Sequence, residues 1–103
     1  MKESVIQHQI LSYLGHIGVF CYRSNTGGAR LPGKGGRPQF VRFGVRGHPD
    51  IVAVYDGKYV GIEVKSEKGR QTKYQRWFQE DLEEAGGVYL LARSVEDIEE
   101  YFS

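Results

Sequence analysis

The sequence is poor in cysteine and in long apolar runs, and each shortage excludes a class of protein. Its single cysteine, Cys21, cannot form an internal disulfide, which excludes a small domain held together by disulfides. Cys21 lies in a short apolar segment and is expected to be a core thiol rather than a nucleophile. No apolar run approaches the roughly 20 residues of a membrane-spanning helix. We therefore expect no membrane partner and a reducing, cytoplasmic environment.

Further absences concern the start of the chain, its glycine-rich segment and its histidines. Residues 1–4 lack the apolar stretch of a signal peptide, so we expect none. The glycines of residues 33–36 lack the GK[ST] ending of a P-loop, so no nucleotide cofactor is expected. His8 and His16 have no partner at metal-ligand spacing, and His48 is expected to lie on the surface.

Length and charge describe one globular domain, residues 1–103, with an uneven charge distribution. The chain is 40% hydrophobic and 26% charged, and its net charge is only +1. Residues 21–49 nevertheless hold six basic side chains and no acid, whereas residues 80–103 are acidic apart from Arg93. This asymmetry predicts a basic face toward a polyanion such as nucleic acid and an acidic back. The alternative is that both segments are simply solvated surface.

Hydrophobic periodicity predicts the first half of an α/β fold. Apolar residues at helical spacing indicate a helix over about residues 3–17, with Gly18 at its end. Residues 19–22 and 39–42 are expected to form short strands. Between them, residues 24–38 are rich in glycine, arginine and proline and predict a long functional or disordered loop.

The second half alternates strands and helices. Thr72 and Gln75 fit a capping box that opens a helix running to about Ala85. Residues 88–91 are expected to form a strand, and Ser94 to cap a last helix through Phe102. The buried stripe of the middle helix is expected to consist of Tyr74, Trp77, Phe78, Leu82 and Ala85.

The most informative local signal is Asp56-Gly57, which predicts a two-residue type I′ turn between strands over residues 49–55 and 58–65. In that register Asp50 lies opposite Glu63, and Lys65 points to the same face as Glu63. Two facing carboxylates repel, so a divalent cation with oxygen ligands fits between them. Since the hairpin is apolar on both faces, we expect a sheet covered by helices on both sides.

Each of these residues also has a structural alternative. Asp50 also suits a turn after Pro49, and the alternative role for Lys65 is a simple salt bridge with Glu63 or Asp50. A glutamate flanked by Ile62 and Val64 in a central strand is nevertheless expensive unless it is paired.

This constellation resembles the PD-(D/E)xK nuclease superfamily, with Pro49-Asp50 and Glu63-Val64-Lys65 as its signature. Within it the chain is similar to the VRR-NUC family, the virus-type replication-repair nucleases. The similarity covers nearly the whole chain, through residues 22–28, 47–50, 63–71, 75–76 and 85–87. The family's fold implies a restriction-endonuclease-like α/β core with a mixed β-sheet flanked by helices. A bacterial or phage-infected cell is the expected host.

The resemblance also implies a metal site for Mg²⁺ or Mn²⁺. Asp50, Glu63 and the carbonyl of Val64 are the expected ligands, with Lys65 as a catalytic residue. Glu3, at the start of the first helix, is a further acidic candidate, although an acid there is also favourable for the helix dipole. Gln75 is assigned to the rim of the active site, with the capping role as the alternative.

The function that follows is a metal-dependent DNA endonuclease. Like other stand-alone members and archaeal junction resolvases, it is expected to cut branched DNA such as a four-way junction, as a homodimer with two matched active sites. The alternatives are a restriction or repair nuclease for linear, flap or mismatched duplexes, and a catalytically silent DNA-binding module. The candidate phosphate contacts are Arg23, Arg30, Lys34, Arg37, Arg42, Arg46, Lys68, Arg70, Lys73 and Arg76.

Overall fold

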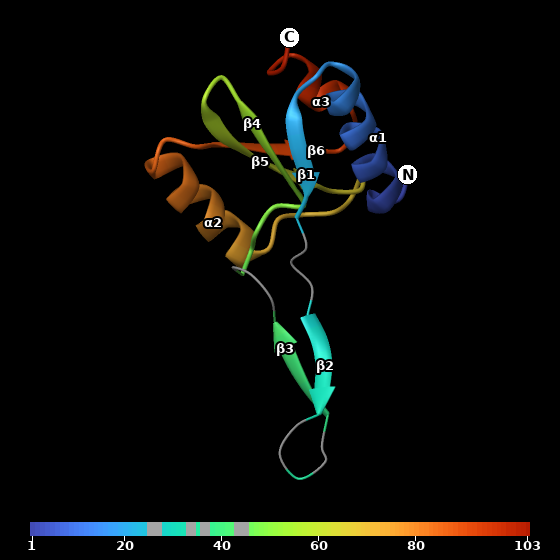
Figure 1. Cartoon of the computed structure of the whole chain (residues 1–103), viewed down its shortest axis with the longest axis vertical. Helices are drawn as coiled ribbons and strands as arrows, with labels where there is room; N and C mark the ends of the chain where they lie inside the picture. Colours follow the sequence, from blue (N-terminus) through green and yellow to red (C-terminus); the bar gives the residue numbers. More distant parts are fainter. Residues whose placement is uncertain (25–27, 33–34, 36–37, 43–45) are drawn as a thin grey trace.

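The protein is a small α/β domain with a mixed four-stranded sheet flanked by helices, seen in a computed structural model that describes residues 1–24, 28–32, 35, 38–42 and 46–103 (Figure 1). The elements in chain order are α1 (Glu3–His16), β1 (Phe20–Arg23), β2 (Gly28–Pro32), β3 (Pro38–Arg42), β4 (Ile51–Tyr55), β5 (Lys58–Val64), α2 (Lys73–Glu84), β6 (Val88–Ala92) and α3 (Glu96–Glu99). No helix of the described ranges is long and apolar enough to cross a membrane.

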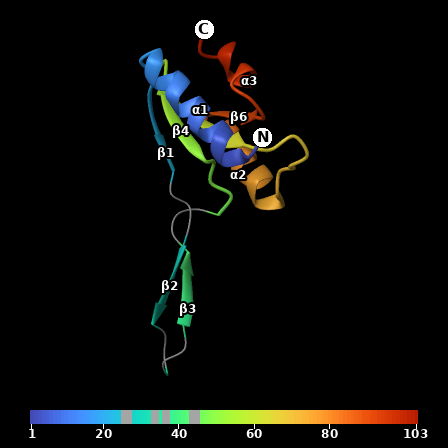
Figure 2. The same cartoon turned by 90° about the vertical axis from the view of Figure 1, so that its right-hand side faces the viewer.

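The sheet order is β1-β4-β5-β6, and only the β5–β6 pair is parallel. That parallel pair needs a crossover, which α2 provides. β2 and β3 form a separate antiparallel ladder, drawn below the sheet in Figure 1. Figure 2 shows α1 running alongside β1.

One face of the sheet packs on α1 and α3 and forms the main core. Ile6, Ile10 and Leu14 recur at helical spacing and are fully buried against this face. From the sheet, Ile51 and Ile62 join the same cluster. Cys21 packs against it and burial raises the pKa of its thiol, as expected for a core cysteine.

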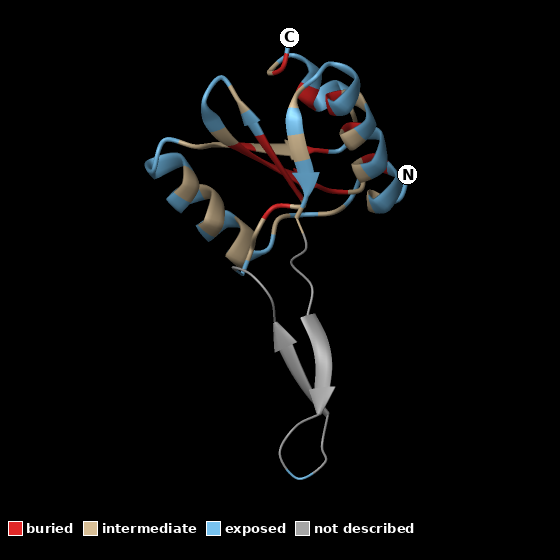
Figure 3. Ribbon diagram, viewed as in Figure 1, coloured by how far each residue is buried: buried red, intermediate tan, exposed pale blue. Residues whose placement is uncertain are grey.

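The opposite face is covered in part by α2, which packs against β6 and reaches Gly61 on β5 through Leu82. Close approach requires glycine there, because a Cβ on Gly61 would lie 2.7 Å from the Pro49 Cγ, and one on Gly87 would collide with Leu82. Farther across this face Val54 is exposed, so the predicted two-sided cover is only partly present (Figure 3).

Two helix predictions are wrong in detail. In α2, Tyr74, Phe78 and Leu82 are half-buried, while Trp77 and Ala85 are exposed, because the residues toward the sheet are spaced four apart. The last helix is four residues long and ends at Glu99, not at Phe102. Ser94 does not cap it, and the helix carries acids at (i, i+3) positions with no basic residue in its last turn.

One strand was not expected. The glycine-rich loop predicted over residues 24–38 contains β2, which pairs with β3 from Gly28 opposite Arg42 to Pro32 opposite Pro38. Proline and glycine are depleted in strands, so this segment carries no strand signal. The two prolines lie at the end of the ladder, where a missing N–H is tolerated.

Candidate functional site

The hairpin turn sets the geometry of the site. Asp56 and Gly57 have φ angles of 54° and 73°, the pair of positive values that a type I′ turn requires. Tyr55 pairs with Lys58 and Ile51 with Ile62, so the predicted register is confirmed. The strand and its ladder begin at Ile51, later than the predicted start at Pro49, and Asp50 lies just outside them, where continuation of the register places it opposite Glu63.

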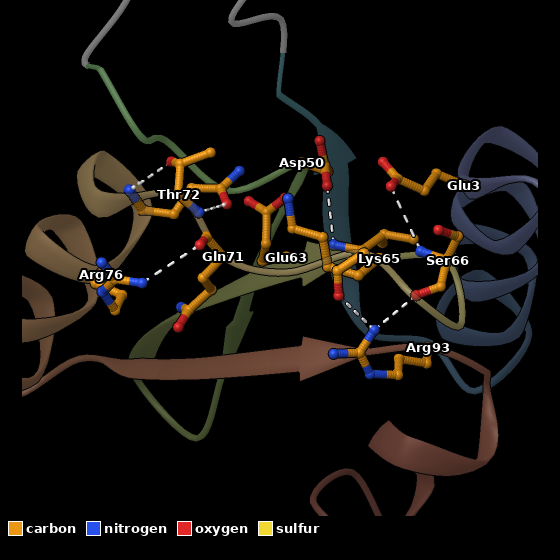
Figure 4. Close-up of polar contacts among 12 residues, drawn as sticks. Glu3, Asp50, Glu63, Lys65, Ser66, Gln71, Thr72, Arg76 and Arg93 are labelled. Carbon is orange, nitrogen blue, oxygen red and sulfur yellow. Dashed lines mark hydrogen bonds and ion pairs between the residues drawn. The ribbon is translucent and has the colours of Figure 1, made fainter.

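Asp50 is held in place at the end of β4. Its Oδ2 accepts a 2.8 Å hydrogen bond from the backbone N–H of Val64, and its carbonyl oxygen accepts one of 2.8 Å from the N–H of Ser24. These contacts tie Asp50 to β5 on one side and to the end of β1 on the other. The carboxylate therefore has a fixed position beside Glu63 (Figure 4).

Glu63 is buried, with 2% of its surface exposed, and its charge is poorly compensated. Its Oε2 lies 3.8 Å from the Nζ of Lys65, while its Oε1 is buried with no hydrogen-bond partner among the described residues. The pKa of Glu63 is raised to about 9, chiefly by burial and next by the charge of the facing Asp50, whose carboxylate also favours the protonated form through a side-chain hydrogen bond, while Lys65 acts in the opposite direction. In the metal-free protein at neutral pH, Glu63 therefore keeps its proton.

Lys65 is also buried, with 8% exposed, at the end of the same strand. Its backbone N–H donates to the carbonyl of Ala92 at 2.9 Å, so β6 fixes the main chain beneath the ammonium. A 3.8 Å separation is near the upper limit of an ion pair, and this contact leaves Glu63 predominantly neutral. The structural alternative, in which Lys65 serves only to neutralise Glu63, accounts poorly for this geometry.

Glu3 reaches the site from the first turn of α1. Its Oε2 accepts a 3.4 Å hydrogen bond from the N–H of Ser66, and its charge contributes to the raised pKa of Glu63. Gly69 packs closely against this carboxylate, because a Cβ added to Gly69 would lie 3.4 Å from Oε2 of Glu3. Figure 4 shows Glu3 directed toward the same region as Asp50.

The carboxylates do not form a closed metal cage. In the part of the chain that the structure describes, no group of three or more His, Cys, Asp or Glu side chains lies close enough together to hold a metal ion. The donor set at hand is thus the facing pair Asp50 and Glu63, whose oxygens are of the type that Mg²⁺ and Mn²⁺ prefer. The partnerless Oε1 of Glu63 fits a cation, because a buried oxygen without a donor is costly.

Arg93 is a residue that the sequence did not single out. Its Nη1 donates to the carbonyls of Ser66 at 2.6 Å and Gly69 at 2.7 Å, and lies 3.3 Å from that of Glu67. One guanidinium thus fixes the turn after Lys65. No sequence signal predicts this contact, because β6 and the turn are joined only through the parallel pairing.

Tyr89 was also missed. It lies on β6 opposite Gly61, on the Glu63 side of the sheet, and only 7% of its surface is exposed. Its hydroxyl makes no hydrogen bond within ordinary limits among the described residues. Burial is the larger effect and raises its pKa overall to about 12, although the side chain of Gln71 lies near enough to lower that pKa. Two buried polar atoms without partners, on Tyr89 and Glu63, therefore lie on one face.

Gln75 has the capping role. Its N–H donates to the Thr72 Oγ1 at 3.2 Å and its Oε1 accepts from the Thr72 N–H at 2.9 Å, so the predicted capping box is confirmed. Its assignment to the rim of the active site stays a prediction.

His48 is not the surface residue that the sequence suggested. It is half-buried, with its Nδ1 2.8 Å from the Ser24 Oγ and 2.9 Å from the Pro49 carbonyl oxygen. Its ring lies 5.4 Å from that of Phe78, measured between centroids. The positive φ of Gly47 turns the chain inward here, which brings His48 against α2.

The candidate phosphate contacts fall into three groups. Arg46 lies 3.9 Å above the ring of Tyr74, and Lys73 lies 5.2 Å from the same ring. Lys34 and Arg37 lie outside the described residues, and Arg30 and Arg42 belong to β2 and β3. The remaining basic side chains are exposed, and they are Arg23, Lys68, Arg70 and Arg76.

No protein-family model matches the chain, and no curated protein sequence matches it.

Proposed function

We propose that this chain is a metal-dependent DNA endonuclease of the PD-(D/E)xK type, with the restriction-endonuclease-like core that this implies. The observation that carries the proposal is the buried, partnerless Oε1 of Glu63 opposite the anchored carboxylate of Asp50. A purely structural pair would satisfy that oxygen with a donor. An oxygen left open in a polar, buried position supports a site for a cation.

Asp50, Glu63 and the carbonyl of Val64 would hold Mg²⁺ or Mn²⁺, with Glu3 nearby. When bound, such an ion supplies a nucleophilic water at neutral pH and stabilises charge on the phosphate. Glu63 would have to release its proton to serve as a ligand, while the N–H of Val64 keeps Asp50 oriented. Lys65 holds its ammonium beside Glu63, where it offsets negative charge that develops on the phosphate.

Branched DNA is the proposed substrate, cut by a homodimer. A four-way junction has approximate two-fold symmetry, and two active sites related by a C2 axis match it. The resemblance to stand-alone junction-cleaving enzymes supports this choice over linear duplex. The basic stretch from Arg23 to Arg46 supports a nucleic-acid partner of either shape.

Two observations favour a second candidate, a DNA-binding module without catalysis. Among the described residues no third acid completes a metal cage, and Glu63 is protonated at neutral pH without metal. In such a module Lys65 would serve only as a partial counter-charge to Glu63. This second candidate predicts that the protein binds DNA but does not cleave it, whichever metal is added.

Incubation of end-labelled four-way junction, flap and linear duplex with the protein in Mg²⁺, Mn²⁺ or EDTA tests the proposal. Paired nicks on opposing strands of the junction, only with metal, are the expected result. Equal cleavage of linear duplex would favour a general repair nuclease. Binding without cleavage in either metal would favour the silent module.

A further inference from the structure

Aromatic side chains lie exposed on the sheet face that carries the carboxylates. Phe20 and Tyr22 on β1 have 67% and 51% of their surfaces exposed, and Val54 has 46%. The two rings lie edge to face with centroids 6.2 Å apart. Such side chains normally lie inside a protein or against a partner, so this patch requires an explanation.

Alternation along the strands places the patch on the same face as the candidate site. Cys21 packs into the core on the α1 side, so Phe20 and Tyr22 point to the other side. Tyr22 pairs with Val52 on β4, and Asp50 lies two residues before Val52, just outside that strand. At a rise of about 3.4 Å per residue, Tyr22 lies about 7 Å along the strands from Asp50.

The patch extends toward β5 through Tyr59. Tyr59 pairs with Val54, which pairs in turn with Phe20 on β1. Burial raises the pKa of Tyr59, and the neighbouring Tyr22 adds to the effect. Three aromatic residues therefore share one region of the sheet, beyond the part that α2 covers.

Basic groups border the other side of the site. Ser24, next but one to Tyr22, bonds His48, whose ring lies against Phe78 on α2. One turn earlier on α2, Tyr74 carries Arg46 and Lys73 over its ring. The two carboxylates thus have aromatic rings on one side and cations on the other. A protein binds a single strand of nucleic acid with these two components, because the rings stack on the bases and the cations contact the phosphates.

A second copy of the chain explains the patch less well. A stable protein interface buries about 800 Å² on each partner, whereas an aromatic side chain supplies about 150–250 Å² even when fully covered. Even when fully covered, Phe20 and Tyr22 would together supply at most about 500 Å². Stacking needs no larger surface, because each base covers one ring.

We propose that Phe20 and Tyr22 form a stacking platform for the bases of unpaired nucleotides next to the carboxylate site. This rests on the proposed function and specifies its substrate, since it requires single-stranded or splayed nucleotides beside the phosphate that is cut. At about 3.4 Å per stacked nucleotide, the distance from Tyr22 to Asp50 corresponds to about two nucleotides. Base identity is not read, because every base has a π-face.

Binding measured without cleavage tests this. Fluorescence anisotropy in EDTA compares a 12-nucleotide single strand with an abasic chain of the same length, which keeps the phosphates and lacks the bases. The wild type should bind the base-containing strand about tenfold more tightly, as expected for one or two stacked bases. The Phe20→Leu/Tyr22→Leu variant should lose that preference and bind the abasic chain as the wild type does.

The matched control keeps the rings. Phe20→Tyr/Tyr22→Phe should retain the full preference for bases, and circular dichroism and melting verify that all variants fold. No preference for bases in the wild type, or an undiminished preference in the leucine variant, would overturn the proposal. So would a monomer–dimer equilibrium, measured by sedimentation, that shifts in the leucine variant while DNA binding stays the same, because the patch would then bind a second copy.

The result separates this inference from the proposed nuclease. A base preference that depends on the two rings, in a protein that cuts nothing in any metal, would support the platform and refute the enzyme. Cleavage without a base preference would do the reverse.

Discussion

Asp50 and Glu63 face each other across the β4–β5 pair, and only one of the two is satisfied. Asp50 accepts a 2.8 Å hydrogen bond from the Val64 N–H, whereas Glu63 keeps its Oε1 buried without a partner in the described part of the chain. The unsatisfied carboxyl responds by holding its proton, with a pKa raised to about 9.

Without metal, stability should fall as the pH rises. Glu63 has an ordinary pKa of 4.5 and a folded pKa of about 9, so between these values the folded state binds a proton that the unfolded state has released. The free energy of unfolding then decreases with pH throughout that window. Thermal melts in EDTA at about pH 5 and about pH 8 should show the decrease, by about 4–8 °C for each 1 kcal/mol of stability that is removed.

Glu63→Gln removes the titrating group and should flatten this dependence. The exposed Glu67 offers a control, because Glu67→Gln should leave the wild-type slope unchanged. A slope that persists in Glu63→Gln would assign it to another group.

Metal should stabilise the fold, and more so at higher pH. Mn²⁺ at 100 times its dissociation constant adds about 2.7 kcal/mol if it binds only the folded state. Because Glu63 must release its proton to bind, the upward shift in melting temperature should be larger at about pH 8 than at about pH 6. Asp50→Asn should show no shift, and an equal shift in that variant would place the metal elsewhere.

The parts of this site that could be predicted from the sequence are those whose contacts join residues close together in the chain. The Asp56-Gly57 turn has only one well-favoured hairpin geometry, so the facing of Asp50 and Glu63 followed from a two-residue signal. The capping box of α2 was predictable for the same reason. Both features depend on residues close together in the chain.

The contacts that the sequence did not predict depend on distant pairing. Tyr89 and Arg93 reach the site because β6 runs parallel to β5, in a register set by the packing of α2 and not by a turn. The sequence did not predict β2, because glycine and proline are rare in strands. The length of α3 was overestimated, because hydrophobic periodicity takes no account of repulsion between its acidic side chains. Such features need the assembled sheet.

Catalysis should depend on the three hairpin residues. Asp50→Asn, Glu63→Gln and Lys65→Ala should each reduce the cleavage rate by at least about a hundredfold, as removal of one group that stabilises the transition state does. Folding and DNA binding should persist. Glu67→Gln again provides the control, and wild-type rates in any one folded variant would remove that residue from the chemistry.

Gly47 should be essential for placing His48 and Arg46. Its φ is +79°, and a Cβ there would collide with the backbone carbonyl of Tyr74. Gly47→Ala should therefore lower the free energy of unfolding by more than about 1 kcal/mol. Gly15 in α1 has open space around it, so Gly15→Ala should instead stabilise by about 0.5–1 kcal/mol, and urea denaturation compares the two.

Binding to DNA should be governed by phosphate contacts from the basic stretch. If several phosphates are bound, affinity should fall on the order of tenfold or more between about 50 and about 200 mM salt. Removing charge at Arg30, Lys34 and Arg37 together should weaken binding equally for all sequences and reduce the salt slope by about one for each phosphate that is no longer neutralised. Lys58, exposed at the hairpin turn, supplies the control variant Lys58→Gln, which should leave the slope unchanged. A slope that the triple variant retains would assign the phosphate contacts to Arg46, Lys73 and their neighbours, and a weakening confined to one sequence would indicate base reading by the stretch.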